Sequence, residues 1–185
     1  MLNRKFKTGQ LLCITIGLSV FFSCNNRAVK KEAHLFNQLS SKTSGIGFQN
    51  ILTENDSVNY FNYMYIYMGG GVAIGDLNND GLQDVYFTGN MVENKLYLNK
   101  GSMQFEDITE EAGVGGDARW ATGVTMGDAN QDGWLDIYVS VSGKWETTKN
   151  LLYINDANEG GVPTFTESAE AYGLADEGNS TQAVF

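Results

Sequence analysis

Short apolar runs, separated by turn-forming stretches, are spaced regularly through the middle of the chain. In the first part of this region they occupy residues 72–74, 84–88, 95–99 and 103–108. Each run has the length of a strand, and strands of this kind are bounded by turn-forming residues. The NKG tripeptide at 99–101, between the last two runs, is a tight-turn signal. The pattern therefore predicts four short antiparallel strands.

The same pattern occurs twice, which is the strongest organisational signal in the sequence. Residues 71–87 read GVAIGDLNNDGLQDVYF, and residues 123–139 read GVTMGDANQDGWLDIYV, 52 residues further on. Downstream, LYLN at 96–99 matches LYIN at 152–155, now 56 residues apart. The growing offset places small insertions near 142–149 and 156–163, because loops of a structural repeat tolerate extra residues.

A four-stranded antiparallel unit that repeats at roughly 50 residues is typical of a β-propeller blade. We therefore expect an all-β fold with one blade at about 66–118, a second at about 119–178, and the start of a third at 179–185. Short stretches after each fourth strand, at 110–113 and 167–173, are expected to form a helical turn.

Two blades and a fraction do not close a propeller, which needs roughly four to eight. We therefore expect residues 44–185 to form an incomplete propeller within the N-terminal fragment of a longer protein. The alternative is a small open or self-associating β-domain, whose strand edges would remain unpaired.

The first 23 residues predict a secretory signal. Residues 1–10 carry three positive charges and no negative ones, and an apolar run of twelve follows at 11–22. Twelve residues rise about 18 Å as a helix, well short of the roughly 30 Å of a hydrocarbon core. The ending FFSC at 21–24 resembles a bacterial lipobox, with Phe21 where Leu is usual. This resemblance implies that Cys24 is acylated and becomes the mature N-terminus, whereas the alternative is an ordinary signal peptide.

Residues 24–43 are polar and mixed in charge, and we expect them to tether the domain to the lipid. The only histidine, His34, lies in this tether, and Cys13 would leave with the signal. Acyl chains on Cys24 would anchor the protein stably. We therefore expect an exported lipoprotein of the bacterial cell envelope. The outer membrane is the expected location, but Asn25 and Asn26 carry no clear sorting signal that decides between the two membranes.

Both repeats place the pattern D-x-N-x-D-G-x-x-D between two strands. Calcium takes six to eight oxygen ligands on a flexible loop, and alternate residues of this pattern supply oxygens. A divalent cation would also remove the mutual repulsion of the carboxylates. The expected ligands are Asp76, Asn78, Asp80, the carbonyl of Leu82 and Asp84 in the first loop, and Asp128, Asn130, Asp132, the carbonyl of Trp134 and Asp136 in the second.

Other interpretations of the acidic loops remain open. They are not EF-hands, because Phe87 and Val139 occupy the position that requires a bidentate Glu. Magnesium fits less well, since it prefers a rigid octahedron and retained waters. The metal-free alternative is a turn held by side-chain-to-backbone hydrogen bonds.

The two loops with their flanks resemble FG-GAP (VCBS-type) repeats, which build the integrin α-subunit propeller and many bacterial surface propellers. The surrounding residues are similar to the cartilage acidic protein-like family, on GIGFQN at 45–50, YMGGGV at 67–72, NKLYLN at 94–99 and GLADEGNSTQAV at 173–184. Its bacterial members are long lipoproteins that end in an ASPIC/UnbV domain. No such segment occurs in these 185 residues, so nothing tied to that domain carries over.

The formal net charge of −10 disfavours nucleic acid and anionic lipid as partners and suits divalent cations. An enzyme finds little support, because the repeats contain no histidine, no cysteine nucleophile and no phosphate loop. Glu106, Asp107 and Glu167 are the carboxylates that an acid/base pair would draw on, if the fold hosted a carbohydrate-active enzyme.

The sequence thus favours an exported, calcium-stabilised β-propeller that binds a protein or glycan ligand and is not an enzyme. A structural module of an envelope complex is a further alternative. In that case Trp120, Trp134 and Trp145 would form a contact patch. Trp120 and Trp145, which fall near loop ends, would equally suit a grip on a sugar ring, although packing within the scaffold is the ordinary role of tryptophan.

Overall fold

The computed structural model describes residues 35–143 and 148–185. Contacts divide the chain into two units, Met1–Gln38 and Leu39–Phe185. The expected signal sequence lies outside the described residues, as do Cys24, His34 and Trp145. In the part of the chain that is described, no helix combines the length and apolar character needed to cross a membrane. The second unit begins at Leu39 and therefore includes the end of the expected tether.

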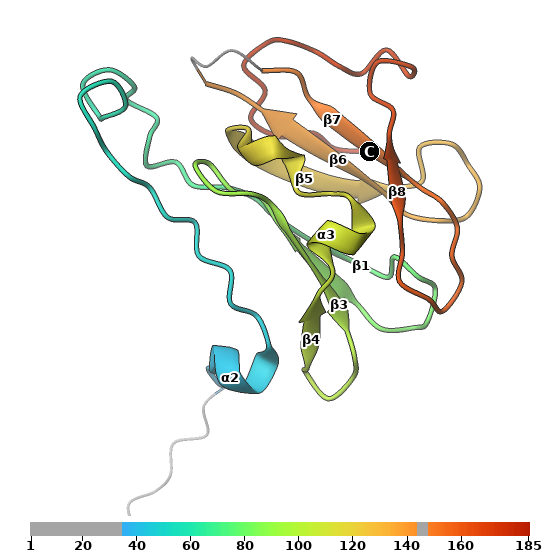
Figure 1. The fold of residues 1–185 in the computed structure, drawn as a ribbon. Helices are drawn as coiled ribbons and strands as arrows, with labels where there is room; N and C mark the ends of the chain where they lie inside the picture. Colours follow the sequence, from blue (N-terminus) through green and yellow to red (C-terminus); the bar gives the residue numbers. More distant parts are fainter. Residues whose placement is uncertain (1–34, 144–147) are drawn as a thin grey trace, which may run out of the picture. The chain divides into compact units, whose positions relative to one another are not determined.

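Two four-stranded antiparallel sheets form this second unit, and in each the strands follow the order of the chain (Figure 1). The first sheet contains β1 (Val72–Gly75), β2 (Asp84–Phe87), β3 (Lys95–Asn99) and β4 (Phe105–Asp107). The second contains β5 (Ala121–Gly127), β6 (Asp136–Val141), β7 (Leu151–Asn155) and β8 (Phe165–Glu167). These are two propeller blades, so the expected all-β fold is confirmed.

Among the described residues, helical structure is limited to short turns. α2 (Ser41–Ser44) precedes the first blade, α3 (Thr109–Ala112) follows β4, and the 3₁₀ turn η2 (Gly116–Ala118) leads into the second blade. α3 lies at the first expected helical turn. At the second, Tyr172 N–H donates to Ser168 but Gly173 N–H donates to Glu170, so the turn does not continue as an α-helix.

The inner strands of the two blades meet backbone to backbone at Gly71. A Cβ at this position would lie 2.9 Å from the backbone nitrogen of Val124, so only glycine permits this approach. Val124 is 4% exposed in this contact, whereas Val72, its counterpart in the first blade, is 55% exposed. Equivalent residues are therefore buried between blades in the second repeat and exposed on the outer face of the first.

Residues 181–185 lie against β5 much as β5 lies against β1. A Cβ on Gly75 would lie 2.8 Å from the sulfur of Met126, and a Cβ on the equivalent Gly127 would lie 2.5 Å from the ring of Phe185. The Thr122 hydroxyl also donates to the carbonyl of Ser180 at 2.7 Å. The chain after the second blade thus begins to repeat the contact between the first two.

Residues 45–51 cross the outer face of the first blade. The ring of Phe48 stacks on Phe87 with centroids 5.1 Å apart, and Phe87 meets Tyr97 edge-on at 5.9 Å. Gly47 N–H donates to the Tyr97 hydroxyl at 3.2 Å. This crossing segment covers part of the apolar face that the second blade does not reach.

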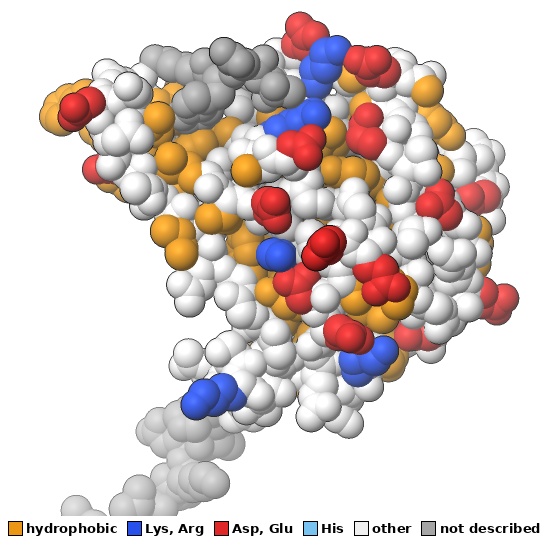
Figure 2. Space-filling view, in the orientation of Figure 1, with side chains coloured by type: hydrophobic (Ala, Val, Ile, Leu, Met, Phe, Trp, Pro, Cys, Tyr) orange, Lys and Arg blue, Asp and Glu red, His pale blue; other side chains and the backbone are white. Residues whose placement is uncertain are grey.

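Negative charge is spread over the described surface. Figure 2 shows Asp and Glu side chains scattered across the drawn face, with Lys and Arg in fewer places. Ion pairs join Lys95 to Asp107 at 3.1 Å and Lys149 to Glu170 at 2.6 Å. Among the described residues, none of the ion pairs involves a carboxylate of the acidic loops.

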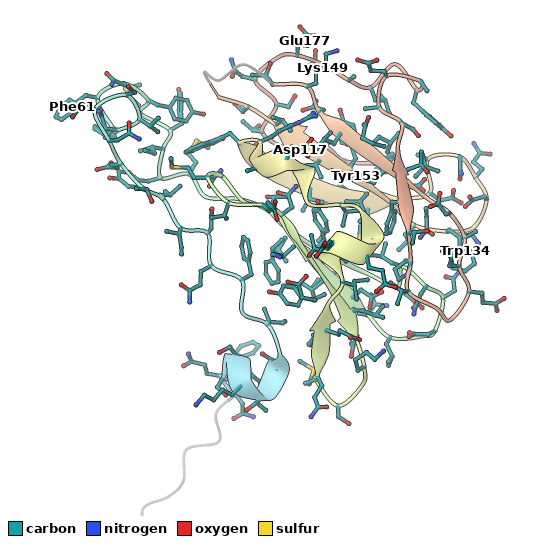
Figure 3. The ribbon with its side chains drawn as sticks, in the orientation of Figure 1. Phe61, Asp117, Trp134, Lys149, Tyr153 and Glu177 are labelled. Carbon is teal, nitrogen blue, oxygen red and sulfur yellow. The ribbon has the colours of Figure 1, made fainter. Side chains whose placement is uncertain are left out.

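The core lies between the facing sides of the two sheets, and equivalent tyrosines of the two blades each donate a hydrogen bond to a backbone carbonyl. Tyr86, fully buried, donates to the carbonyl of Val114 at 2.6 Å, and Tyr138 in the second blade donates to Leu174 at 3.0 Å. Burial raises the pKa of Tyr86 well above its usual value, so its hydroxyl stays a neutral donor. Tyr153, labelled in Figure 3, is also buried in this core.

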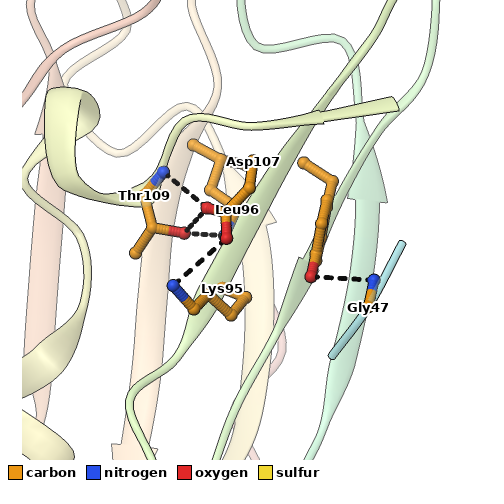
Figure 4. Close-up of polar contacts among 6 residues, drawn as sticks. Gly47, Lys95, Leu96, Asp107 and Thr109 are labelled. Carbon is orange, nitrogen blue, oxygen red and sulfur yellow. Dashed lines mark hydrogen bonds and ion pairs between the residues drawn. The ribbon is translucent and has the colours of Figure 1, made fainter. Parts of the chain in front are cut away.

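A polar network fixes the end of the first blade (Figure 4). The Thr109 hydroxyl accepts from Leu96 N–H at 2.9 Å and donates to Asp107 at 2.6 Å, while Lys95 pairs with the same carboxylate. Burial alone would raise the pKa of Asp107, but the hydrogen bonds from Thr109 and the charge of Lys95 outweigh it and lower that pKa. Its contribution to stability is therefore complete above the ordinary carboxyl value of 3.8 and is lost as the pH falls through the lowered pKa.

In the second blade, different residues form the corresponding hydrogen bonds at the end of the fourth strand. Glu167 takes the place of Asp107, and Ala169 takes that of Thr109. The longer Glu167 side chain itself accepts from Leu152 N–H at 3.2 Å and from Ala169 N–H at 2.9 Å. One added methylene thus replaces the threonine hydroxyl.

This exchange predicts a compensated double substitution in the first blade. Thr109→Ala should lower the free energy of unfolding by about 1–2 kcal/mol, because the buried Leu96 N–H loses its acceptor. Adding Asp107→Glu should restore most of the loss by reproducing the arrangement around Glu167. Urea denaturation of Thr109→Ala, Asp107→Glu and the double variant measures the coupling between the two positions. If the losses in the free energy of unfolding simply add, the hydrogen bonds around Asp107 and those around Glu167 are not equivalent.

Candidate cation-binding loops

Each acidic loop joins the inner strand of a blade to its second strand, and the two loops have the same internal hydrogen bonds. Asp76 accepts from Asp80 N–H at 3.1 Å and from Gly81 N–H at 2.8 Å. In the second loop, Asp128 accepts from Asp132 N–H at 3.0 Å and from Gly133 N–H at 2.9 Å. The first carboxylate of the pattern thus closes the turn in both repeats.

The side chains at the third and fifth positions of the pattern also form hydrogen bonds within the loop. Asp80 accepts from Leu82 N–H, and Asp132 accepts from Trp134 N–H, both at 2.8 Å. The amides of Asn78 and Asn130 donate to these aspartates at 3.1 and 2.8 Å. Both turns need left-handed backbone, with φ of 86° at Gly81 and 89° at Gly133, which glycine adopts at no steric cost.

The last carboxylate of each pattern is buried and links three segments. Asp84 accepts from Leu77 N–H at 3.0 Å and from Asn99 N–H at 2.8 Å, and Asp136 accepts from Ala129 and Asn155 in the same way at 2.8 and 2.9 Å. Burial raises the pKa of Asp84 to about 6, since it outweighs these hydrogen bonds, and the charges of Asp80 and Asp76 add to the rise. The pKa of Asp136 is raised for the same reasons.

The chemistry of these donors fits a divalent cation. Each loop brings three carboxylates and an amide oxygen into one turn, and none of the ion pairs of residues 35–143 and 148–185 neutralises them. Oxygen donors of this kind are those that calcium prefers. Carboxylate oxygens that accept one N–H retain further lone pairs for a metal.

The geometry itself is that of a turn held by its own hydrogen bonds. Within the described part of the chain, no three Asp, Glu, His or Cys side chains converge tightly enough to form a metal-binding group. Leu82 and Trp134, whose carbonyls were expected as ligands, donate their N–H groups to the loop aspartates. Trp134, labelled in Figure 3, belongs to the loop between β5 and β6.

The first loop is packed against the second blade, a contact that the sequence did not indicate. Asn78 is 1% exposed, its carbonyl accepts from Gly160 N–H at 2.8 Å, and its amide donates to Gly161 at 3.1 Å. The amide of Asn155 donates to the Leu77 carbonyl at 2.8 Å. The insertion at 156–163 in the second repeat therefore packs against the first acidic loop. The turn-rich composition of the insertion did not predict this contact.

The other candidate residues occupy structural positions. Glu106 pairs with Lys100 at 3.5 Å, and Asp107 and Glu167 hold the strand ends described above. Trp120 is 5% exposed and meets Tyr63 edge-on at 5.4 Å. It therefore has the packing role that is ordinary for tryptophan.

Comparison with known proteins supports the repeat assignment. A family model described as FG-GAP-like repeat matches residues 76–139, which begin at the first acidic loop and contain the whole of the second. Over this range the chain is therefore similar to FG-GAP-like repeats.

Two kinds of characterised protein are similar to longer parts of the chain. Cartilage acidic protein 1 of Xenopus tropicalis is 33% identical over 93 residues, covering 50% of this chain and 14% of that protein. Cartilage acidic protein 1 of Homo sapiens is 32% identical over 97 residues, covering 52% and 14%. Integrin alpha-8 of Gallus gallus is 29% identical over 136 residues, covering 64% and 13%. The chain thus spans about 13–14% of the length of these relatives.

The buried carboxylates predict a structural effect that needs no metal. In the presence of a chelator, Asp84→Asn should lower the free energy of unfolding by about 1–3 kcal/mol, because an NH₂ group replaces one of two buried acceptors. The matched substitution Asp80→Asn, on an exposed residue of the same loop, should change it by less than about 0.5 kcal/mol. Urea denaturation in EGTA compares the two, and equal losses would contradict the linking role of Asp84.

Proposed function

We propose that this chain forms part of an exported, calcium-stabilised β-propeller scaffold that binds a protein or glycan ligand at the bacterial cell envelope. The observation that carries the proposal is the pair of acidic loops. They occur at the same place in two successive blades, with the same hydrogen bonds and the same unneutralised carboxylates. The similarity of the chain to FG-GAP-like repeats and to integrin alpha-8 supports a binding scaffold rather than an enzyme.

The calcium ligands we propose are the oxygens of alternate loop residues. In the first loop they come from Asp76, Asn78, Asp80, the Leu82 carbonyl and Asp84, and in the second from Asp128, Asn130, Asp132, the Trp134 carbonyl and Asp136. A bound cation would supply charge neutralisation and would hold each loop between its two strands. Because the first loop also contacts residues 160–161, its cation would stabilise the junction between the blades.

A third blade is proposed to begin at residues 179–185. Support comes from the repeated contact of the inner strands, in which Phe185 lies against Gly127 as Met126 lies against Gly75. Further blades would bury the exposed apolar side chains of the first blade, Val72 and Ile74, which are 55% and 62% exposed.

Calcium binding predicts a defined stoichiometry. Isothermal titration of the protein with CaCl₂ should give two ions per chain, falling to one in Asp80→Ala and in Asp132→Ala. Saturation at about 100 times Kd should stabilise the fold by about 2.7 kcal/mol per site, which raises the melting temperature. Glu106→Ala, an exposed carboxylate outside the loops, should leave two ions. Identical melting curves with calcium and with EGTA would rule out the proposed stabilisation.

Export and anchoring are proposed from the sequence, through Cys24. In a bacterial host supplied with an alkynyl fatty acid, the full-length protein should incorporate the label and sediment with the membranes. Cys24→Ser should lose the label, whereas Cys13→Ser, in the part removed with the signal, should keep it. Labelling that survives Cys24→Ser would exclude acylation at this residue.

A further inference from the structure

The segment before the first blade displays an unusual number of apolar side chains. Residues 59–68 read NYFNYMYIYM, and within them Phe61 is 93% exposed, Met64 63% and Tyr65 55%. Figure 2 shows hydrophobic side chains gathered where this segment protrudes, and Figure 3 places Phe61 at its tip. Exposed apolar side chains in such a group commonly mark an interaction site.

This aromatic segment is held in one conformation by its own polar residues. Asn59 accepts from Phe61 N–H at 3.0 Å and from Asn62 N–H at 3.1 Å, and it donates to the Asn55 carbonyl at 3.0 Å. Ile66, fully buried, anchors the segment to the core. The aromatic side chains are thus presented by an ordered loop, which lowers the entropy lost when a ligand binds.

A cavity of about 680 Å³ lies between the aromatic segment and the inner ends of the blades. One wall carries Phe61 and Tyr65, with the largely buried Trp120, and the other carries Thr122, Ser142 and Asn179. The volume is in the range of roughly 300–1,000 Å³ typical of small-ligand sites. Of the described residues that line it, none is charged.

The lining is selective in its chemistry. The polar side chains of the lining already form hydrogen bonds within the protein, because the Thr122 hydroxyl donates to the Ser180 carbonyl at 2.7 Å and the Ser142 hydroxyl donates to Asn179 at 3.1 Å. Each hydroxyl oxygen keeps acceptor lone pairs, which a ligand hydroxyl can use and an apolar ligand cannot. Among the described residues of this lining, a cationic ligand would find no carboxylate, and a phosphorylated one would be repelled by a protein with a net charge of −10. A sugar ring matches both walls of the cavity. Its apolar C–H face can stack on the aromatic side chains, and its neutral hydroxyls can form hydrogen bonds with the polar ones.

We propose that this cavity binds a neutral carbohydrate, with Phe61 and Tyr65 stacking on its rings and Thr122, Ser142 and Asn179 facing its hydroxyls. The inference rests on the proposed binding function and names its site and ligand class. Thr122 and Asp128 stand at opposite ends of β5, six residues or roughly 20 Å apart along a strand. The cavity is therefore separate from the acidic loops.

The test is direct binding of defined neutral hexaoses to the full chain, with cello-, xylo-, manno- and malto-hexaose as probes, by isothermal titration. At least one hexaose should bind, and Tyr65→Ala should weaken its binding about tenfold, while Tyr65→Phe, which keeps the ring, should stay within about twofold. Tyr172→Ala removes a tyrosine that is 44% exposed outside the cavity and should have no effect. Melting curves check that each variant is folded. Phe61→Ala is a second variant of the cavity lining, and because Phe61 is exposed its loss should not affect folding.

Each other outcome overturns the inference in a distinguishable way. Hexaose binding that is unchanged in Tyr65→Ala and Phe61→Ala would place the sugar elsewhere and leave the proposed scaffold function standing. Binding of an oligogalacturonate in preference to all four neutral hexaoses would refute the neutral ligand class. If no oligosaccharide binds while calcium binding is intact, the carbohydrate assignment fails and the calcium-stabilised scaffold does not.

Discussion

The rest of the structure depends on the buried carboxylate that begins the second strand of each blade. Asp84 and its counterpart Asp136 each accept two backbone N–H groups, one from the start of the acidic loop and one from the end of the third strand. Burying a charged group is costly unless it is hydrogen-bonded, so these bonds must form together with the strands they join. The acidic loop is therefore an integral part of the blade, and the loop's own hydrogen bonds position its remaining carboxylates.

Contact between blades imposes the second constraint. Gly71 lets the inner strands approach backbone to backbone, and the insertion at 156–163 then reaches the first acidic loop, where Asn78 becomes buried. The first loop thus depends on the second blade as well as on its own. The corresponding Asn130 in the second loop is only partly buried, so two loops with the same sequence pattern differ in their surroundings.

The two ends of the inner strands have opposite chemistry. The acidic loops follow the ends of β1 and β5 and concentrate negative charge, whereas the neutral, aromatic-lined cavity lies where these strands begin. The proposed cation ligands and the proposed carbohydrate site therefore lie at opposite ends of the inner strands. A substitution in an acidic loop should therefore leave the cavity unchanged, and a substitution in the cavity should leave the acidic loops unchanged.

The sequence by itself determined the strands, the repeat and the acidic turns, because these depend on local spacing: alternating apolar residues, glycine at left-handed positions, and side chains that bond within five residues. It could not reveal that Glu167 replaces both Asp107 and Thr109, that Asn155 holds the carbonyl of Leu77, or that the aromatic segment at 59–68 faces Ser142 and Asn179 across a cavity. Only the tertiary structure decided these, because each joins residues far apart in the chain whose meeting depends on how the blades pack.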